Sequence, residues 1–261
     1  MINIVVCVKY VPDATGDRHF ADDLTLDRDD VDGLLSELDE YAVEQALQIA
    51  ENSDDEVEVT VVTVGPEDAK DALRKALSMG VDKAIHVEDD DLHGTDVIGT
   101  SLVLAKAVEK AGFDLVVSGM ASTDGTAGVV PALLAERLKV PQATLLSEVS
   151  VEAGLVRGSR DTDAATEQVE APLPAVISVT DRSGEARYPS FKGIMAAKKK
   201  PVETWDLSDL DVETDEVGLD GAYTVVDSAA ERPARTTGTV VKDEGEGGKQ
   251  LAEYLAGQKF V

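Results

Sequence analysis

The chain has 261 residues and is strongly acidic, with 24 Lys and Arg against 52 Asp and Glu and a formal net charge of −28. A field of that sign repels nucleic acid and anionic membrane surfaces, so no nucleic-acid partner is expected. No apolar run approaches the ~18 to 20 residues of a membrane span, and no cationic leader precedes the first apolar run. We therefore expect a cytoplasmic protein without direct membrane insertion.

The acid excess is spread over the whole chain. Such enrichment with few aromatics is typical of disorder, but here 43% of the residues are apolar and fall in regular strand and helix patterns. We expect a folded, halophile-like protein whose acid-rich surface suits a high-salt cytoplasm, where screening shortens charge repulsion. Cys7 is the only cysteine and the three histidines show no ligand spacing, so neither a disulfide nor metal catalysis is expected.

The first half of the chain alternates short apolar runs with segments of helical periodicity. Strands are expected at residues 3–8, 57–64, 83–87 and 114–118, and helices at residues 39–51, 67–79, 95–111 and 129–138. Four strand-then-helix repeats predict an α/β protein with a doubly wound, mostly parallel, Rossmann-like sheet and right-handed crossovers. Pro12 is expected to end the first pairing, while Leu24 and Leu26 are candidates for a small β-ribbon in the otherwise unassigned residues 14–36.

Beyond residue 138 the pattern changes from alternating strands and helices to strands alone. Residues 143–151 and 154–158 are expected to form a hairpin, and residues 167–179 to carry a further strand. These late strands are expected to add to one edge of the sheet. Residues 187–200 then form an exposed loop that runs into a short helix and three lysines.

From residue 201 onward strand and helical periodicity are weak, until a short helix at residues 248–255. We therefore expect two parts, an α/β nucleotide-binding domain over residues 1–200 and an extended C-terminal arm over residues 201–261. So long a segment with little core of its own packs either along its own domain or on a partner subunit.

The loop from Gly119 to Gly128 is the main candidate for a binding site. It follows a β-branched run, is rich in Gly, Ser, Thr and Asp, and precedes an apolar repeat at helical spacing. In an open parallel sheet, the unpaired N–H groups at such a helix start suit a phosphate. Gly125 lets the backbone approach a ligand, and Asp124 accepts a hydroxyl or caps the loop's own amides. Ordinary turn chemistry explains the same residues, and neither the GxGxxG fingerprint nor the P-loop is present.

In this order and at these separations, the segments resemble the beta subunit of electron transfer flavoprotein over nearly the whole chain. The stretches that carry the resemblance are CVKYVPD, DEYAVEQAL, ALSMGVDKAIHV, DLVVSGMASTDGTAGVVP, LPAVISV, RYPSFKGIMAAKKKP and RTTG. The resemblance implies an adenine nucleotide alpha-hydrolase-like fold. It also implies a heterodimer whose alpha subunit holds most of an FAD and which passes electrons from flavin dehydrogenases to a quinone- or ferredoxin-linked oxidoreductase.

The family implies that the beta subunit is not itself an enzyme but holds an adenine nucleotide, AMP in ordinary members and a second FAD in electron-bifurcating ones. The implied contacts lie at the carboxyl ends of the strands and in the loop, at Cys7, Val8, Ser36, Val64, Gly119, Asp124, Gly125, Thr126, Ala127, Gly128 and Val129. The loop is one residue shorter than the common DGDTAQVGP form and lacks the NQTG of AMP-holding members, so it is more similar to the bifurcating form. Ser36 stands where many members have Asn.

In the family, a loop matching residues 187–193 docks partner dehydrogenases by inserting one apolar side chain. Phe191 occupies that position, with Tyr188 and Lys192 beside it. A protruding aromatic residue among polar ones is a typical hot spot, and the alternative is a Phe folded back onto its own sheet. Arg160 and Asp161 fall on a family Arg-Glu pair near the subunit interface.

Two other function classes share parts of this pattern. A stand-alone adenine-nucleotide sensor of universal-stress type would have the same sheet and loop, but it leaves RYPSFKGIMAAKKK and the C-terminal arm unexplained. An ATP-cleaving adenylating enzyme is suggested only by SGMASTDG, which lacks consecutive glycines and a basic residue for the leaving pyrophosphate. The chain shows no Ser-His-Asp or Cys-His pattern, which favours an electron carrier.

Overall fold

The computed structural model describes residues 1–28, 31–230, 232–235, 238 and 240–260. The chain divides into two compact units, Met1–Asp227 and Ser228–Val261. The second unit contains helix α7 (Gly247–Gly257), which agrees with the short helix expected there. Thr236 and Thr237 of the RTTG stretch lie outside the described residues.

A nine-stranded sheet forms the centre of the first unit, in the order β11-β5-β4-β1-β6-β10-β7-β8-β9. All neighbouring strands are parallel except β7–β8 and β8–β9, which are antiparallel. The strands are β1 (Ile2–Cys7), β4 (Val57–Val64), β5 (Lys83–Val87), β6 (Leu115–Gly119), β7 (Gln142–Glu152), β8 (Leu155–Asp161), β9 (Thr166–Pro172), β10 (Ala175–Val179) and β11 (Val202–Trp205). The doubly wound, mostly parallel sheet with added edge strands is therefore confirmed.

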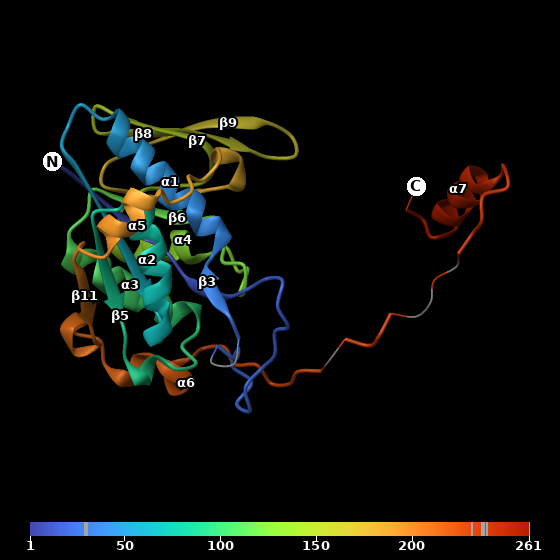
Figure 1. Ribbon diagram of the computed structural model, residues 1–261, viewed down its shortest axis with the longest axis horizontal. Helices are drawn as coiled ribbons and strands as arrows, with labels where there is room; N and C mark the ends of the chain where they lie inside the picture. Colours follow the sequence, from blue (N-terminus) through green and yellow to red (C-terminus); the bar gives the residue numbers. More distant parts are fainter. Residues whose placement is uncertain (29–30, 231, 236–237, 239, 261) are drawn as a thin grey trace. The chain divides into compact units, whose positions relative to one another are not determined.

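Helices cover both faces of this sheet. On one face lie α1 (Glu37–Asn52) and α2 (Lys70–Met79), which are seen in front of the sheet in Figure 1, and on the other lie α3 (Val97–Ala111) and α4 (Val130–Leu138). Two shorter helices are α5 (Phe191–Ala197), which contacts α2, and α6 (Gly218–Gly221). The predicted helix ends are confirmed, since Gly80 and Gly112 directly follow α2 and α3 and have positive φ angles of 146° and 76°.

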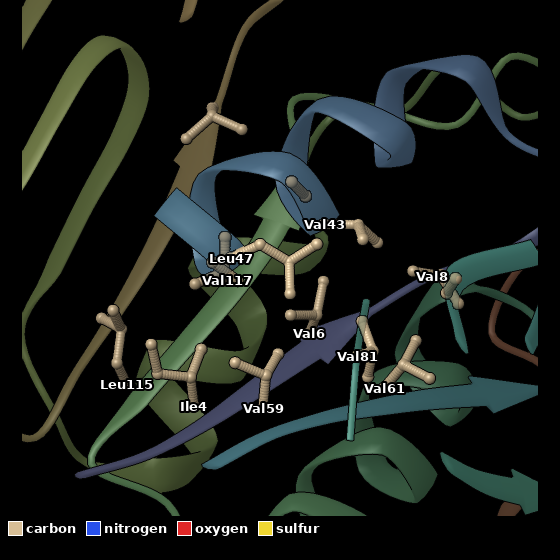
Figure 2. Close-up of a cluster of buried hydrophobic side chains, with 14 of the residues drawn as sticks. Ile4, Val6, Val8, Val43, Leu47, Val59, Val61, Val81, Leu115 and Val117 are labelled. Carbon is tan, nitrogen blue, oxygen red and sulfur yellow. The ribbon is translucent and has the colours of Figure 1, made fainter. Parts of the chain in front are cut away.

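Apolar side chains from both faces of the strands make two hydrophobic clusters. In the cluster under α1, Val6 of β1 and Val117 of β6 lie near Val43 and Leu47 of the helix (Figure 2). The central strands are buried on both faces, which explains why their sequences are continuous apolar runs rather than alternating ones.

Three strand expectations need correction. The late strands do not all add to one edge, because β10 lies inside the sheet between β6 and β7, and only β7, β8 and β9 extend the edge. The predicted strand within residues 167–179 is two strands, β9 and β10, separated at Leu173-Pro174, where proline removes a ladder donor. The weakly patterned stretch after residue 201 begins with β11, which pairs with β5 at the opposite edge.

The N-terminal connection also differs from expectation. Pro12 does not end the pairing but is the last residue of β2 (Tyr10–Pro12), which pairs with β3 (Gly33–Leu35) in a separate ribbon. Pro12 is opposite Gly33 at the end of this two-stranded ribbon, where a missing N–H is tolerated. Leu26 makes an isolated bridge with Phe20 rather than with Leu24, which has a positive φ angle of 65°.

Candidate functional site

The order of the strands places a topological switch point at the carboxyl ends of β1 and β6. The chain leaves these two neighbouring strands toward opposite faces of the sheet, since β1 leads to α1 on one face and β6 leads to α4 on the other. In open α/β sheets, ligands bind in the crevice at such a switch point. The segment after β1 begins with Val8 and Lys9, and the segment after β6 is the glycine-rich loop, residues 120–129 (hereafter the switch loop).

Asp124 anchors the switch loop across this switch point. Its side chain is only 2% exposed, and it forms ion pairs with Lys9 Nζ at 2.9 Å and Arg28 Nη2 at 2.7 Å. Its Oδ1 also accepts a hydrogen bond from the Gly125 amide at 2.6 Å. Burial opposes ionisation of Asp124, but Lys9, Ser122 and Arg28 outweigh it and hold the pKa well below its ordinary value. Asp124 is therefore a charged structural anchor that caps the loop's own backbone.

The backbone amides of the switch loop divide into two groups. The Thr126 amide donates to the Ser122 carbonyl at 3.1 Å, with Thr126 itself in the left-handed region at φ 53°. The amides of Ala127, Gly128 and Val129 have no acceptor among the residues that the structure describes, and all three residues are exposed. The resemblance implies that the amides of residues 126–129 meet the phosphate; three of them are available, and that of Thr126 is used within the loop.

Gly119 allows a close approach between two elements of the domain. A Cβ at this position would lie 2.5 Å from Asp39 Oδ1 and 2.8 Å from the Leu38 carbonyl, so only glycine lets β6 approach the start of α1 this closely. Asp39 is buried and accepts a hydrogen bond from the Lys9 amide at 2.9 Å. Burial raises the pKa of Asp39 to about 7, although hydrogen bonds from the Lys9 and Gly119 amides lower it in part.

The other implied nucleotide contacts lie at the carboxyl ends of β1 and β4 and just before α1, but not on one face of the sheet. Cys7 and Val64 belong to the cluster on the α3 side, whereas Val8 belongs to the cluster on the α1 side. Burial and the neighbouring Asp39 raise the pKa of the Cys7 thiol to about 12, so the thiol stays protonated. Ser36 precedes α1, and its hydroxyl is fully buried with no partner among the described residues.

The implied docking segment projects from the surface at α5. Phe191, the first residue of the helix, is 81% exposed and Tyr188 is 93% exposed, so Phe191 is not folded back onto its own sheet. Lys192 is also exposed. Within the same short helix Ile194 and Met195 are partly exposed, which enlarges the apolar surface.

Both ends of this segment are fixed to the body of the domain. Arg187 Nε contacts Glu44 at 2.6 Å, and its two terminal nitrogens contact Glu51 at 2.6 and 3.0 Å, both acids being on α1. At the other end, Lys200 Nζ donates to the carbonyls of Leu77, Gly80 and Val81 at the end of α2. Lys200 is thus a helix cap rather than a solvated lysine.

Arg160 and Asp161 lie on β8 but do not pair with each other. Arg160 forms an ion pair with Glu167 of β9 at 2.8 Å, and Asp161 accepts from Thr166 at 2.7 Å and lies 3.7 Å from Arg182. Neighbouring residues on a strand point to opposite faces, which explains the separate partners.

Lys9, Arg28 and Arg18 are the residues of this site that sequence reasoning did not identify. Arg28 also donates to the Tyr10 carbonyl at 3.0 Å, and Arg18 donates to the Thr123 carbonyl at 2.9 Å. The available signal was compositional, because two arginines fall within the acidic, unassigned residues 14–36. In the part of the chain that is described, no helix is long and apolar enough to cross a membrane, and no group of three His, Cys, Asp or Glu side chains could hold a metal ion.

The chain is thus a doubly wound, Rossmann-like α/β protein with a glycine-rich loop at its switch point, the place where proteins of this class bind ligands. The profile of the electron transfer flavoprotein domain matches residues 23–210. The chain is also 52% identical to the electron transfer flavoprotein subunit beta of Mycobacterium tuberculosis over 100% of both chains. It is 30% identical to that of Megasphaera elsdenii over 100% of both, and 34% identical to that of Bacillus subtilis over 82% of this chain and 83% of the relative.

The chain belongs to the electron transfer flavoprotein beta subunit family, which confirms the resemblance seen in its sequence. As a member of this family it is an electron carrier and not a catalytic enzyme.

Proposed function

We propose that this chain is the nucleotide-holding subunit of a heterodimer with a flavin-bearing alpha subunit. The complex takes electrons from flavin dehydrogenases and passes them to a quinone- or ferredoxin-linked oxidoreductase. When bound, the flavin supplies the electron-accepting and electron-donating chemistry. The residues of this chain bind the nucleotide, fix its phosphate and present a docking surface.

The observation that carries the nucleotide proposal is the switch loop. Its available amides at residues 127–129 follow Asp124, which pairs with the positive side chains of Lys9 and Arg28. The loop leaves β6 at the switch point, where open α/β sheets bind ligands. Backbone N–H groups and positive charge suit a phosphate, whether the monophosphate of AMP or the pyrophosphate of a second FAD. The shortened loop favours the second FAD.

The nucleotide proposal is tested by co-purifying the chain with its alpha subunit and extracting all bound nucleotide by denaturation. A yellow heterodimer that releases two FAD supports the second-FAD form, and one FAD with one AMP supports the ordinary form. A colourless homodimer that contains only adenine nucleotide would favour the stand-alone sensor, which leaves the docking segment without a role. A flavin heterodimer without any second nucleotide would refute the nucleotide site.

Docking of the dehydrogenase is assigned to Phe191, with Tyr188 and Lys192 around it. Truncation of an aromatic hot spot costs ~2 kcal/mol or more, so Phe191→Ala should slow electron transfer from the dehydrogenase by about 30-fold at subsaturating complex. Flavin content should not change, because the ring is 81% exposed and contributes little to folding. Tyr223→Ala is a matched control, since Tyr223 is an 82% exposed aromatic residue outside the segment. Equal rates for the two variants would refute docking at Phe191.

A further inference from the structure

Two positive side chains meet one carboxylate at the switch loop, in a chain that carries an excess of acids. Lys9 and Arg28 both pair with the single carboxylate of Asp124, at 2.9 and 2.7 Å. Asp39 is a further acid close to Lys9, and its buried carboxyl accepts a hydrogen bond from the Lys9 amide. In a chain with a net charge of −28, a pair of cations that share one buried carboxylate is a local positive site.

The two cations differ in how firmly they are held. Arg28 is bound at both ends of its guanidinium, by the Tyr10 carbonyl at 3.0 Å and by Asp124, and its side chain is 25% exposed. Lys9 contacts Asp124 through one ammonium group and its side chain is 40% exposed. Lys9 Nζ also lies 3.9 Å from the place that a Cβ of Gly125 would occupy, beside the exposed part of the loop.

We propose that Lys9 is a phosphate-binding residue of the nucleotide site and that Arg28 is a positioning residue that holds Asp124 and the loop in place for it. This inference rests on the proposed nucleotide function and goes beyond it, because it assigns phosphate recognition to side chains outside the loop. The amides of residues 127–129 then supply directional hydrogen bonds, while Lys9 supplies the compensating charge.

The experiment compares ligands that differ only in phosphate. The flavin heterodimer, freed of its second nucleotide, is titrated calorimetrically with adenosine, AMP and ADP, the last two representing one phosphate and a pyrophosphate. Lys9→Met should weaken AMP and ADP binding by about 10- to 100-fold, as expected for loss of a charged hydrogen-bond donor, and change adenosine binding by less than twofold. Lys9→Arg should restore most of the AMP affinity.

Lys83→Met is the matched control, because Lys83 is also ion-paired and partly exposed but is the first residue of β5, at the amino ends of the parallel strands and away from the switch loop. Arg28→Gln should speed hydrogen exchange across residues 120–126, whereas Lys9→Met should not. If Lys9→Met weakens the binding of adenosine and AMP by the same factor, Lys9 has a purely structural role. If it leaves the AMP affinity unchanged, Lys9 has no role in binding. Either result overturns the inference. If the unaltered complex binds AMP and ADP no better than adenosine, the proposed phosphate site itself fails.

Discussion

The ion pairs of Arg187 with Glu44 and Glu51, at the start of the proposed docking segment, allow a prediction of stability. Arg187→Met keeps the aliphatic stem but removes the guanidinium from Glu44, whose side chain is 6% exposed. Glu44 then retains two donors, the backbone amide of residue 187 at 3.1 Å and the side-chain amide of Gln48 at 2.9 Å. Removal of one partner of a buried pair costs about 3 to 5 kcal/mol. Because the Arg187 side chain is 31% exposed, water compensates in part and we expect a loss of about 2 to 3 kcal/mol.

The assay is urea unfolding of the complex at neutral pH, with hydrogen exchange measured across residues 183–200. Arg187→Met should lower the midpoint of unfolding and raise exchange in that segment. The double variant Glu44→Gln with Arg187→Met should recover part of the loss, since no unpaired buried charge remains. A single-variant loss below about 0.5 kcal/mol, the size of an ordinary surface change, would refute the idea that this ion pair fixes the segment.

Three further predictions concern charge. The melting temperature should rise from low salt to molar KCl, because a Debye length of ~3 Å at 1 M screens the repulsion within a chain whose net charge is −28. An unchanged melting temperature would contradict this. The pKa of Asp39 is raised to about 7 in the folded protein, so between about pH 4 and pH 7 only the unfolded carboxyl ionises. The free energy of unfolding should therefore fall as the pH rises through this range. Asp39→Asn should show a smaller fall in parallel urea titrations. Lys200→Met should cost about 1 to 3 kcal/mol in the same assay, because three carbonyls lose a charged donor.

Most of the local structure could be predicted from the sequence. Short runs rich in apolar and β-branched residues predicted β1, β4, β5 and β6, and glycines marked the ends of α2 and α3. These signals depend on periodicity and backbone preference within a few residues. The exposed position of the docking segment also followed from its composition, and Phe191 is indeed exposed. The family followed from short motifs in a fixed order.

Contacts between distant segments were decided only by the tertiary structure. The place of β10 inside the sheet depends on pairing with β6 and β7, which its five apolar residues do not specify. Asp124 pairs with Lys9, which is 115 positions away in the sequence, and with Arg28, which is 96 positions away. A charged side chain in a polar segment carries no periodic signal of its partner. Local sequence thus determined the central strands, the main helices and the place of the loop, whereas strand order decided which charges meet at the loop.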